Sequence, residues 1–233
     1  MDAIILAGGK GTRLNGVISD VPKPLAPING KPFLDILLTQ LNKFACIKKV
    51  VLAVGYKSEM IVNRYKNSPV YNFRILFSEE KELLGTGGAI KKAIALTNTD
   101  DVIALNGDSF IEVDIEDLIK FHRINNSSLT VVLKEVNNVG RYGSIEIDSK
   151  RRILNFKEKS GATGKGLINA GVYVIKRTLF DTIEEERKLS VEKDIMPELI
   201  RQNAYGYVVE GKFIDIGTPE TYKVASEYFK RRC

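Results

Sequence analysis

The sequence is poor in the residues that build redox, metal-cluster and nucleophilic sites. It has no tryptophan, one histidine, His122, and two cysteines, Cys46 and Cys233. Two cysteines so far apart have neither the spacing of a zinc site nor the number for a disulfide framework, and we expect Cys46 to pack in the core. His122 falls within a predicted helix, away from every motif, so we expect a surface or packing role. No nucleophile–histidine catalytic machinery is therefore predicted.

Long apolar runs are also missing. No stretch reaches the length that spans a membrane, and the first residues lack the basic start and long apolar core of a signal peptide. With so few cysteines, this predicts a cytoplasmic protein without a membrane partner. The formal net charge of +6 suits anionic substrates, but it is dispersed. The only dense basic run, Lys230-Arg231-Arg232, lies near the end of the sequence, and we expect no nucleic-acid partner.

Strand-like and helix-like segments alternate along the 233 residues, which predicts one α/β domain with a mainly parallel sheet flanked by helices. An antiparallel pair of strands is expected at 144–148 and 153–157. The other expected strands are 3–6, 49–54, 73–77, 102–105, 129–134, 169–175, 205–209 and 213–216. One expected helix begins at Pro32, and the 85–89 loop is expected to open a second one that runs to Leu96. The other expected helices are 58–65, 115–124, 179–186, 192–202 and 218–231.

A glycine-rich loop follows the first predicted strand, in Leu6-Ala7-Gly8-Gly9-Lys10-Gly11-Thr12-Arg13. Three glycines let the backbone approach a ligand closely, its N–H groups can form a nest for an anion, and Lys10 and Arg13 add positive charge. The spacing fits neither the P-loop nor the dinucleotide-binding motif, and an ordinary turn at a strand end is the alternative. Pro22-Lys23-Pro24 favours the phosphate site, because the prolines hold the backbone around Lys23 stiff and extended.

Two acids are candidates for a metal site. Asp108 follows a buried strand, and Asp215 is flanked by apolar residues. A buried unpaired carboxylate is costly, and a divalent cation between the two acids would remove that cost; Mg²⁺ binds one or two carboxylates together with phosphate oxygens. The alternatives are a turn aspartate at 108 and a capping or salt-bridged aspartate at 215. Because ligands bind beyond the carboxyl ends of strands in open α/β sheets, we expect both acids, Glu158, the first loop and the 85–89 loop to share one cleft.

The order of several motifs resembles one known family. The motifs are LAGGKGTRL at 6–14, Pro22-Lys23-Pro24, Leu84-Gly85-Thr86-Gly87-Gly88-Ala89, Asn106-Gly107-Asp108, Arg141-Tyr142-Gly143, Phe156-Lys157-Glu158-Lys159, Ile168-Asn169-Ala170-Gly171 and Phe213-Ile214-Asp215-Ile216-Gly217-Thr218-Pro219-Glu220. Together they resemble the signature of the sugar-1-phosphate nucleotidyltransferases (sugar-nucleotide pyrophosphorylases) over nearly the whole chain. Segment 22–34, the 85–88 loop and the short C-terminal part look most like the bacterial D-glycero-D-manno-heptose 1-phosphate guanylyltransferases.

This resemblance implies a Rossmann-like three-layer nucleotidyltransferase fold. A nucleotide-binding part would cover about 1–135, a sugar-phosphate-binding part about 136–217, and a C-terminal helix 218–231. The phosphate of a sugar 1-phosphate would attack the α-phosphorus of a nucleoside triphosphate, and pyrophosphate would leave. The implied substrates are GTP and the heptose 1-phosphate, the product is GDP-heptose for surface glycans, and the cofactor is Mg²⁺.

The site residues that the resemblance implies fall into four groups. Arg13 and Lys23 are the catalytic cations that neutralise the polyphosphate, and Asp108 and Asp215 hold the metal. The nucleotide-binding residues are Leu6, Ala7, Gly8, Gly9, Gly11, Thr12, Gly85, Thr86, Gly87, Gly88, Asn106 and Gly107. The sugar-phosphate-binding residues are Tyr142, Gly143, Glu158, Lys159 and Asn169, with Glu158 on two sugar hydroxyls and Lys159 on the attacking phosphate.

Two departures from the common family pattern leave the base open. Asn15 stands where relatives have proline, and Gly87-Gly88 stands where many carry Gln or Ala. Mannose-1-phosphate guanylyltransferase and an N-acetylmuramate- or hexosamine-type uridylyltransferase are the alternatives. A glycosyltransferase of similar fold would carry an Asp-x-Asp motif, but Asp108 is followed by Ser109-Phe110. A non-catalytic nucleotide-binding module would not need the catalytic and metal-binding charges. The oligomeric state, including a homo-oligomer, stays open.

Overall fold

The computed structural model describes residues 1–11, 14, 18, 20–68, 70–157, 164–200 and 203–230. The strands are β1 (Asp2–Leu6), β2 (Pro27–Ile28), β3 (Lys31–Pro32), β4 (Lys49–Val54), β5 (Arg74–Glu79), β6 (Asp101–Asn106), β7 (Ser109–Ile111), β8 (Leu129–Val136), β9 (Ser144–Ile147), β10 (Ile153–Lys157), β11 (Gly166–Lys176), β12 (Ala204–Val209) and β13 (Phe213–Asp215). The α-helices are α1 (Phe33–Leu41), α2 (Ser58–Tyr65), α3 (Gly85–Ile94), α4 (Ile115–Ile124), α5 (Met196–Ile200) and α6 (Pro219–Lys230). Short turns of other helix types are η2 (Lys23–Leu25), η3 (Arg177–Phe180) and the π-helical η4 (Val191–Ile195).

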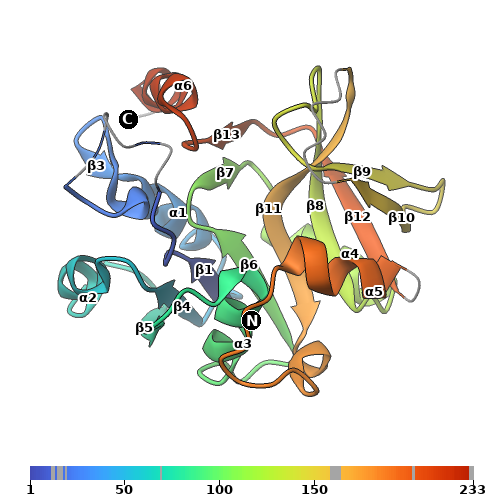
Figure 1. The fold of residues 1–233 in the computed structure, drawn as a ribbon, viewed down its shortest axis with the longest axis horizontal. Helices are drawn as coiled ribbons and strands as arrows, with labels where there is room; N and C mark the ends of the chain where they lie inside the picture. The colour runs from blue at the N-terminus through green and yellow to red at the C-terminus, as the bar shows by residue number, and fades with distance from the viewer. Residues whose placement is uncertain are drawn as a thin grey trace.

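A nine-stranded sheet forms the centre of the molecule (Figure 1). In one half, β1 lies between β4 and β6, β5 forms the edge beyond β4, and all these pairings are parallel. In the other half, β11 pairs antiparallel with β6, β8 and β9, and β12 runs parallel to β8. The expected antiparallel pair is β9 and β10. The predicted α/β fold, with parallel central strands, flanking helices and a smaller antiparallel part, is confirmed.

Alternation of side chains along the central strands produces three layers. On β1, Ala3 and Ile5 belong to a core that α1, α2, α4 and α6 cover, whereas Ile4 belongs to a second core against α3 and α5. Successive side chains of a strand point to opposite faces, so the all-apolar run of β1 marks a strand buried on both sides. His122 on α4 is 1% exposed, so its packing role is confirmed, and Cys46 is partly buried against the first core.

The predicted helices of the C-terminal third are the least accurate. The expected helix 179–186 is only the short turn η3, because residues 184–188 are all charged and supply no apolar face. The expected helix 192–202 is split into η4 and α5. Pro197 has no N–H to donate to the carbonyl four residues earlier, so a regular α-helix is interrupted in this turn. Two small antiparallel pairs were also not predicted, β2 with β3 and β7 with β13.

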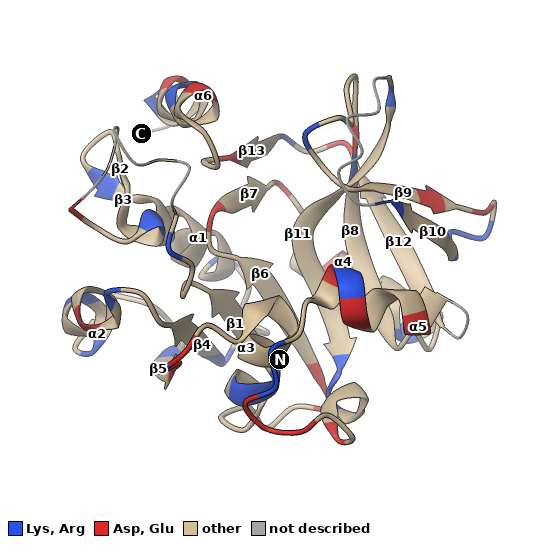
Figure 2. Cartoon of the chain, in the orientation of Figure 1, with Lys and Arg blue, Asp and Glu red and all other residues tan. Residues whose placement is uncertain are grey.

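Lysine and arginine residues are spread over both halves of the chain, as the dispersed charge predicts (Figure 2). None of the helices in the described ranges has the length and apolar character needed to cross a membrane.

Candidate active site

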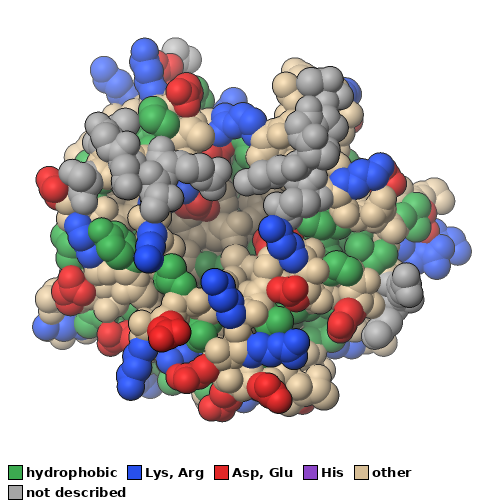
Figure 3. All heavy atoms as spheres, viewed as in Figure 1, with side chains coloured by type: hydrophobic (Ala, Val, Ile, Leu, Met, Phe, Trp, Pro, Cys, Tyr) green, Lys and Arg blue, Asp and Glu red, His purple; other side chains and the backbone are tan. Residues whose placement is uncertain are grey.

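The predicted cleft lies beyond the carboxyl ends of β1 and β6, and the molecule is visibly hollowed near the centre of the view in Figure 3. Three adjoining cavities form it, and Asp108 lines all three. The large cavity, of about 560 Å³, includes Arg141, Asn169, Glu192 and Asp215 in its lining. The α3 cavity, about 280 Å³, is lined by Leu6, Gly8, Gly9, Glu80, Leu83, Gly85, Thr86, Ala89, Asn106, Gly107 and Asp108. The Lys23 cavity, about 240 Å³, is lined by Leu6, Gly9, Gly11, Lys23, Pro24, Gly107 and Asp108.

The loop after β1 is anchored on both neighbouring strands. The N–H of Ala7 donates to the carbonyl of Ala53 at 2.7 Å, and the N–H of Gly107 donates to the carbonyl of Leu6 at 3.0 Å. A Cβ on Gly107 would lie 2.5 Å from the Leu6 carbonyl oxygen, so this close approach requires glycine. Gly11 needs glycine for another reason, its φ of +64°. Thr12 and Arg13, predicted for the nucleotide and for catalysis, lie outside the described residues.

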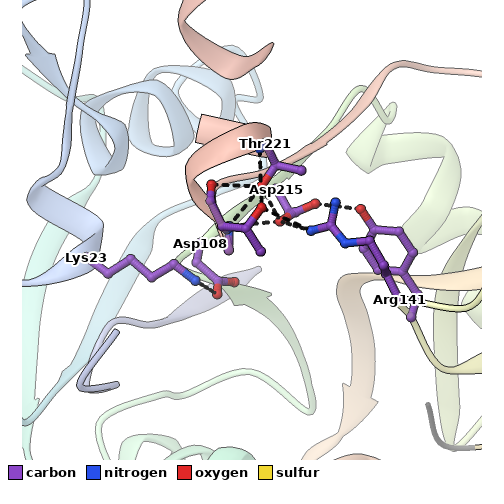
Figure 4. Close-up of polar contacts among 8 residues, drawn as sticks. Lys23, Asp108, Arg141, Asp215 and Thr221 are labelled. Carbon is purple, nitrogen blue, oxygen red and sulfur yellow. Dashed lines mark hydrogen bonds and ion pairs between the residues drawn. The ribbon is translucent and has the colours of Figure 1, made fainter. Parts of the chain in front are cut away.

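Lys23 and Asp108 form an ion pair at the centre of the cleft (Figure 4). The distance from Lys23 Nζ to Asp108 Oδ2 is 2.5 Å, and the side chains are 10% and 40% exposed, respectively. Lys23 follows Pro22, whose backbone is extended, and begins η2 together with Pro24. The expectation that the backbone at Lys23 is extended is therefore wrong, because Lys23 begins a 3₁₀ turn. Its ammonium group still lies in the cleft, where Lys23 lines the Lys23 cavity as the partner of Asp108.

Asp215, at the end of β13, has four polar partners (Figure 4). Its Oδ2 accepts from the hydroxyl of Tyr142 at 2.5 Å, and its Oδ1 accepts from the N–H of Gly217 at 2.8 Å and from Thr221 Oγ1 at 3.0 Å. Arg141 Nη2 lies 3.7 Å from Oδ1. Burial, together with the bond to Asp215, raises the pKa of Tyr142 well above its usual value. Of the two interpretations left open for Asp215, the salt-bridged aspartate describes its surroundings here, since protein donors and a guanidinium already offset the cost of its burial.

Strand pairing brings the two predicted metal ligands to one place. β13 pairs with β7, with Asp215 opposite Ser109, and the N–H of Ile216 donates to the carbonyl of Asp108 at 2.9 Å. Both carboxylates line the large cavity. In the part of the chain that is described, no group of three or more acids, cysteines or histidines could hold a metal ion. Two carboxylates beside a cavity still fit Mg²⁺, which takes its other ligands from water and phosphate oxygens.

The glycines at 85–88, predicted to form a loop, lie in the first turn of α3 and face another segment of the protein. A Cβ on Gly85 would lie 2.5 Å from the carbonyl oxygen of Leu189, and one on Gly88 would lie 2.4 Å from that of Arg187. The hydroxyl of Thr86 accepts from the N–H of Val191 at 2.9 Å and donates to Glu192 Oε2 at 3.1 Å. Of these four predicted nucleotide residues, Gly85 and Thr86 line the α3 cavity, whereas Gly87 and Gly88 do not line it and are buried against segment 187–195.

Three of the predicted sugar-phosphate-binding residues, Asn169, Tyr142 and Gly143, line the large cavity. Asn169 Nδ2 donates to the hydroxyl of Tyr173 at 2.6 Å, and that hydroxyl donates to Glu192 Oε1 at 2.8 Å. Glu192 therefore connects Asn169, in the lining of the large cavity, with Thr86 at the start of α3 through hydrogen bonds. Glu158 and Lys159, predicted for the sugar hydroxyls and the attacking phosphate, lie outside the described residues.

Two buried polar atoms in the wall of the large cavity have no hydrogen-bond partner in the described structure. They are Asn106 Oδ1 and Ser109 Oγ, and Ser109 is only 8% exposed. Leaving a buried polar group unpaired costs about 1–3 kcal/mol. Both oxygens are shielded from solvent, so a hydroxyl group of a ligand in this cavity would bind them only after the side chain turns toward the cavity.

Sequence reasoning missed several residues of the cleft. Ser109 could have been noticed, because it directly follows Asp108 in the same motif. Thr221 could also have been noticed, because it directly follows the 213–220 motif and donates to Asp215 six residues earlier. Glu80 and Glu192 carry no comparable signal: Glu80 lies outside the motifs, and Glu192 reaches the site through Thr86, 106 positions earlier in the chain.

The chain is similar to known proteins over nearly its whole length. A family model described as "Nucleotidyl transferase" matches residues 2–231. The chain is 41% identical to the D-glycero-alpha-D-manno-heptose 1-phosphate guanylyltransferase of Aneurinibacillus thermoaerophilus, over 97% of each chain. It is 40% identical to the enzyme of the same name from Campylobacter jejuni subsp. jejuni, over 95% of this chain and 97% of the relative. The crystal structure of HddC from Yersinia pseudotuberculosis complexed with GMP-PN has a TM-score of 0.86 and 36% identity, covering 98% of this chain and 99% of the other.

Proposed function

The chain belongs to the nucleotidyl transferase family, and we propose that it transfers a guanylyl group from GTP to a D-glycero-D-manno-heptose 1-phosphate. A phosphate oxygen of the sugar phosphate bonds to the α-phosphorus of GTP, the bond from that phosphorus to the bridging oxygen breaks, and pyrophosphate leaves with the electron pair. The products are GDP-heptose and pyrophosphate. The observation that carries this proposal is that Asp108 lines three adjoining cavities, which suits a reaction joining two substrates at one point.

The α3 cavity and the Lys23 cavity suit the nucleotide. Backbone at Gly8 and Gly9 lines the first of them, next to the apolar side chain of Leu83. Lys23 supplies an ammonium group at the polyphosphate end, and Arg13 is proposed to add a second cation there. Oriented charges in a site shielded from water contribute strongly to phosphoryl and nucleotidyl transfer.

Asp108 and Asp215 are the residues that would hold Mg²⁺. When bound, the ion neutralises phosphate oxygens of the nucleotide. Asp108 would then exchange its bond to Lys23 for the cation, and Lys23 would be left to pair with phosphate. Asp215 keeps its position through Tyr142, Gly217 and Thr221, so its carboxylate is oriented before any ligand arrives.

The large cavity suits the sugar 1-phosphate, because its polar lining matches a polyhydroxylated ligand. Unpaired Asn106 Oδ1 and Ser109 Oγ would bind the sugar hydroxyls after turning toward the cavity, and Asn169 lies beside them. Glu158 and Lys159 are proposed to complete this half, on the sugar hydroxyls and on the attacking phosphate.

We propose a nucleotide-binding part at about 1–135, a sugar-phosphate-binding part at about 136–217 and the closing helix at 218–231. Asn106 and Ser109 reach the large cavity from the first part, so the two parts share the site.

A cytoplasmic enzyme that supplies surface-glycan synthesis, with no nucleic-acid or membrane partner, fits these substrates, and a homo-oligomer is compatible with them.

The test is pyrophosphate release by the purified protein with Mg²⁺. GTP, UTP, CTP and dTTP are each combined with heptose, mannose and N-acetylhexosamine 1-phosphates. We expect the highest kcat/KM with GTP and the heptose 1-phosphate. A preference for UTP would overturn the guanylyl assignment, and a preference for mannose 1-phosphate would overturn the heptose. Asp108→Asn should abolish turnover while GTP binding stays measurable; unchanged turnover in that variant would contradict the proposed role of Asp108.

A further inference from the structure

Tyr173, on β11, lies between two residues that line the large cavity but does not line it itself. Its side chain is 0% exposed. The hydroxyl group lies 2.6 Å from Asn169 Nδ2 and 2.8 Å from Glu192 Oε1. Tyr173 therefore connects Asn169 with Glu192 from a position where it does not touch a ligand.

The direction of these hydrogen bonds is fixed at both ends of the network. The Glu192 carboxylate only accepts, so the Tyr173 hydroxyl donates its single hydrogen to it. At the other end the N–H of Gly171 only donates, and it lies 2.9 Å from Asn169 Oδ1. The Asn169 amide therefore turns its oxygen to Gly171 and its nitrogen to Tyr173. One N–H of Nδ2 is used on Tyr173, and the second has no acceptor among the described residues.

Glu192 is held in place through its other oxygen. Oε2 accepts from Thr86 Oγ1 at 3.1 Å and from Ser190 Oγ at 2.8 Å. Ser190 also caps η4 by accepting from the N–H of Lys193 at 3.2 Å. Because Thr86 lies in the first turn of α3, the acceptor that Tyr173 uses is fixed relative to both α3 and η4.

We infer that Glu192, acting through Tyr173, is a positioning residue that keeps Asn169 as a hydrogen-bond donor to the sugar 1-phosphate. This inference rests on the proposed function, which assigns that substrate to the large cavity and gives Glu192 and Tyr173 no role. The free N–H of Asn169 is suited to an oxygen of the phosphate or of a sugar hydroxyl. A network that serves only the stability of the fold is the alternative that the experiments must separate.

The first experiment is a double-mutant cycle of Tyr173→Phe and Asn169→Ala. Tyr173→Phe should raise KM for the sugar 1-phosphate roughly 5-fold and KM for GTP less, because Asn169 loses the acceptor that orients it. Asn169→Ala should raise the same KM roughly 10-fold. Adding Tyr173→Phe to Asn169→Ala should change this KM by less than about 2-fold, since the hydroxyl acts only through Asn169. Effects that simply multiply would overturn the inference.

Tyr65→Phe is the matched control. The Tyr65 hydroxyl also donates to a carboxylate, Asp35 Oδ1 at 2.5 Å, and the side chain is 3% exposed on α2, outside the lining of the three cavities. This variant should lose stability in the same way as Tyr173→Phe and keep both KM values. An equal rise in KM for the sugar 1-phosphate would show that lost stability is sufficient, and it would contradict the positioning role.

A second experiment reverses the direction of the network and measures stability. Asn169→Asp removes the donor to the Tyr173 hydroxyl, so two carboxylates compete for one hydrogen and the melting temperature should fall. Adding Glu192→Gln supplies a donor at the other end. The glutamine amide can donate to the Tyr173 hydroxyl, which then donates to the introduced aspartate.

The double variant Asn169→Asp/Glu192→Gln should therefore regain part of the lost melting temperature. Its kcat/KM for the sugar 1-phosphate should stay low, because the free N–H is absent. A double variant no more stable than Asn169→Asp would overturn the inference even if Tyr173→Phe failed to fold. Absence of pyrophosphate release with every substrate pair would instead reject the proposed function, and the melting temperatures would still decide whether Glu192 sets the direction of the network.

Discussion

The hydroxyl of Tyr142 donates to Asp215 Oδ2 at 2.5 Å, and this bond joins residues 73 positions apart in the chain. It ties the segment before β9 to the end of β13, and Arg141 lies against the same carboxylate from the neighbouring position. Asp215, which is predicted to bind a metal, is thus also the residue that links two segments lining the large cavity.

Removing the Tyr142 hydroxyl tests this link. Tyr142→Phe keeps the ring that packs edge-on against Phe213 and deletes only the donor. Because Asp215 keeps three other polar partners, we expect a loss of about 1 kcal/mol in the free energy of unfolding, measured by chemical denaturation. KM for the sugar 1-phosphate should rise more than KM for GTP. Tyr205→Phe is the control, since no hydrogen bond of the Tyr205 hydroxyl occurs in the described structure; equal effects of both variants would contradict the link.

Ser109→Ala separates stability from binding. The Ser109 hydroxyl is buried without a partner, so replacing it with hydrogen should leave the free energy of unfolding unchanged or raise it by up to about 1 kcal/mol. The kcat/KM for the sugar 1-phosphate should fall on the order of 10-fold, because a hydrogen bond to the ligand is lost. A destabilised variant with normal kinetics would mean that the hydroxyl serves the fold instead.

The glycines of the two segments predicted to bind the nucleotide should respond differently to alanine. In Gly88→Ala the new Cβ would lie 2.4 Å from the carbonyl oxygen of Arg187, so we expect the free energy of unfolding to fall by about 1–3 kcal/mol. At Gly9 no atom lies within 4 Å of the corresponding position, which opens on two cavities. Gly9→Ala should therefore keep its stability and lose affinity for GTP. Thermal melting and calorimetric titration measure the two effects, and the reverse pattern would refute this assignment.

The single histidine predicts one feature of the pH dependence of stability. Burial lowers the pKa of His122 below its ordinary value of 6.5, with Lys176 and Arg123 acting in the same direction and Asp101 opposing them. Nδ1 faces Thr130 Oγ1 at 2.8 Å, and Nε2 lies 3.5 Å from Asp101 Oδ1. Below pH 6.5 the unfolded chain binds the proton more readily than the folded one, so stability should fall as the pH is lowered through this value.

Denaturant unfolding between about pH 5 and pH 7 checks the prediction for His122. His122→Gln retains an acceptor or donor for Thr130 but does not titrate, so its free energy of unfolding should change less over this range than that of the wild type. An identical slope in both proteins would show that His122 is not the group responsible.

The central strands and the position of the cleft could be predicted from the sequence because they depend on local patterns. Apolar runs such as 3–6 identify strands buried on both faces, and the rule that ligands bind beyond the carboxyl ends of strands brings Asp108 to the cleft. The pairing of Asp215 with β7 was not predicted, yet the family motif still placed both acids in one site. Arg13, Glu158 and Lys159 lie outside the described residues, so their roles remain predictions.

The partners of the site residues could not be predicted in the same way. Asp215 with Tyr142, and Thr86 with Glu192, join segments that only the folded chain brings together. A buried acid looks the same in sequence whether a metal ion or a guanidinium offsets its charge. The glycines at 85–88 illustrate this further, because close packing against 187–191 and close approach of a ligand require the same residue type.

The ion pair between Lys23 and Asp108 has a consequence for how ligands influence one another. In the cleft without ligands the two opposite charges offset each other, so each attracts an incoming ion less strongly than it would alone. A cation bound to the Asp108 carboxylate leaves the Lys23 ammonium group free to pair with an anion. An anion bound to that ammonium group likewise leaves the carboxylate free to bind a cation. Each type of ligand should therefore strengthen the other's affinity by the same factor, as reciprocity requires. Lys23 thus acts as a counterion attached to the protein, which pairs with Asp108 when no ligand is bound and with the anion once a cation occupies Asp108.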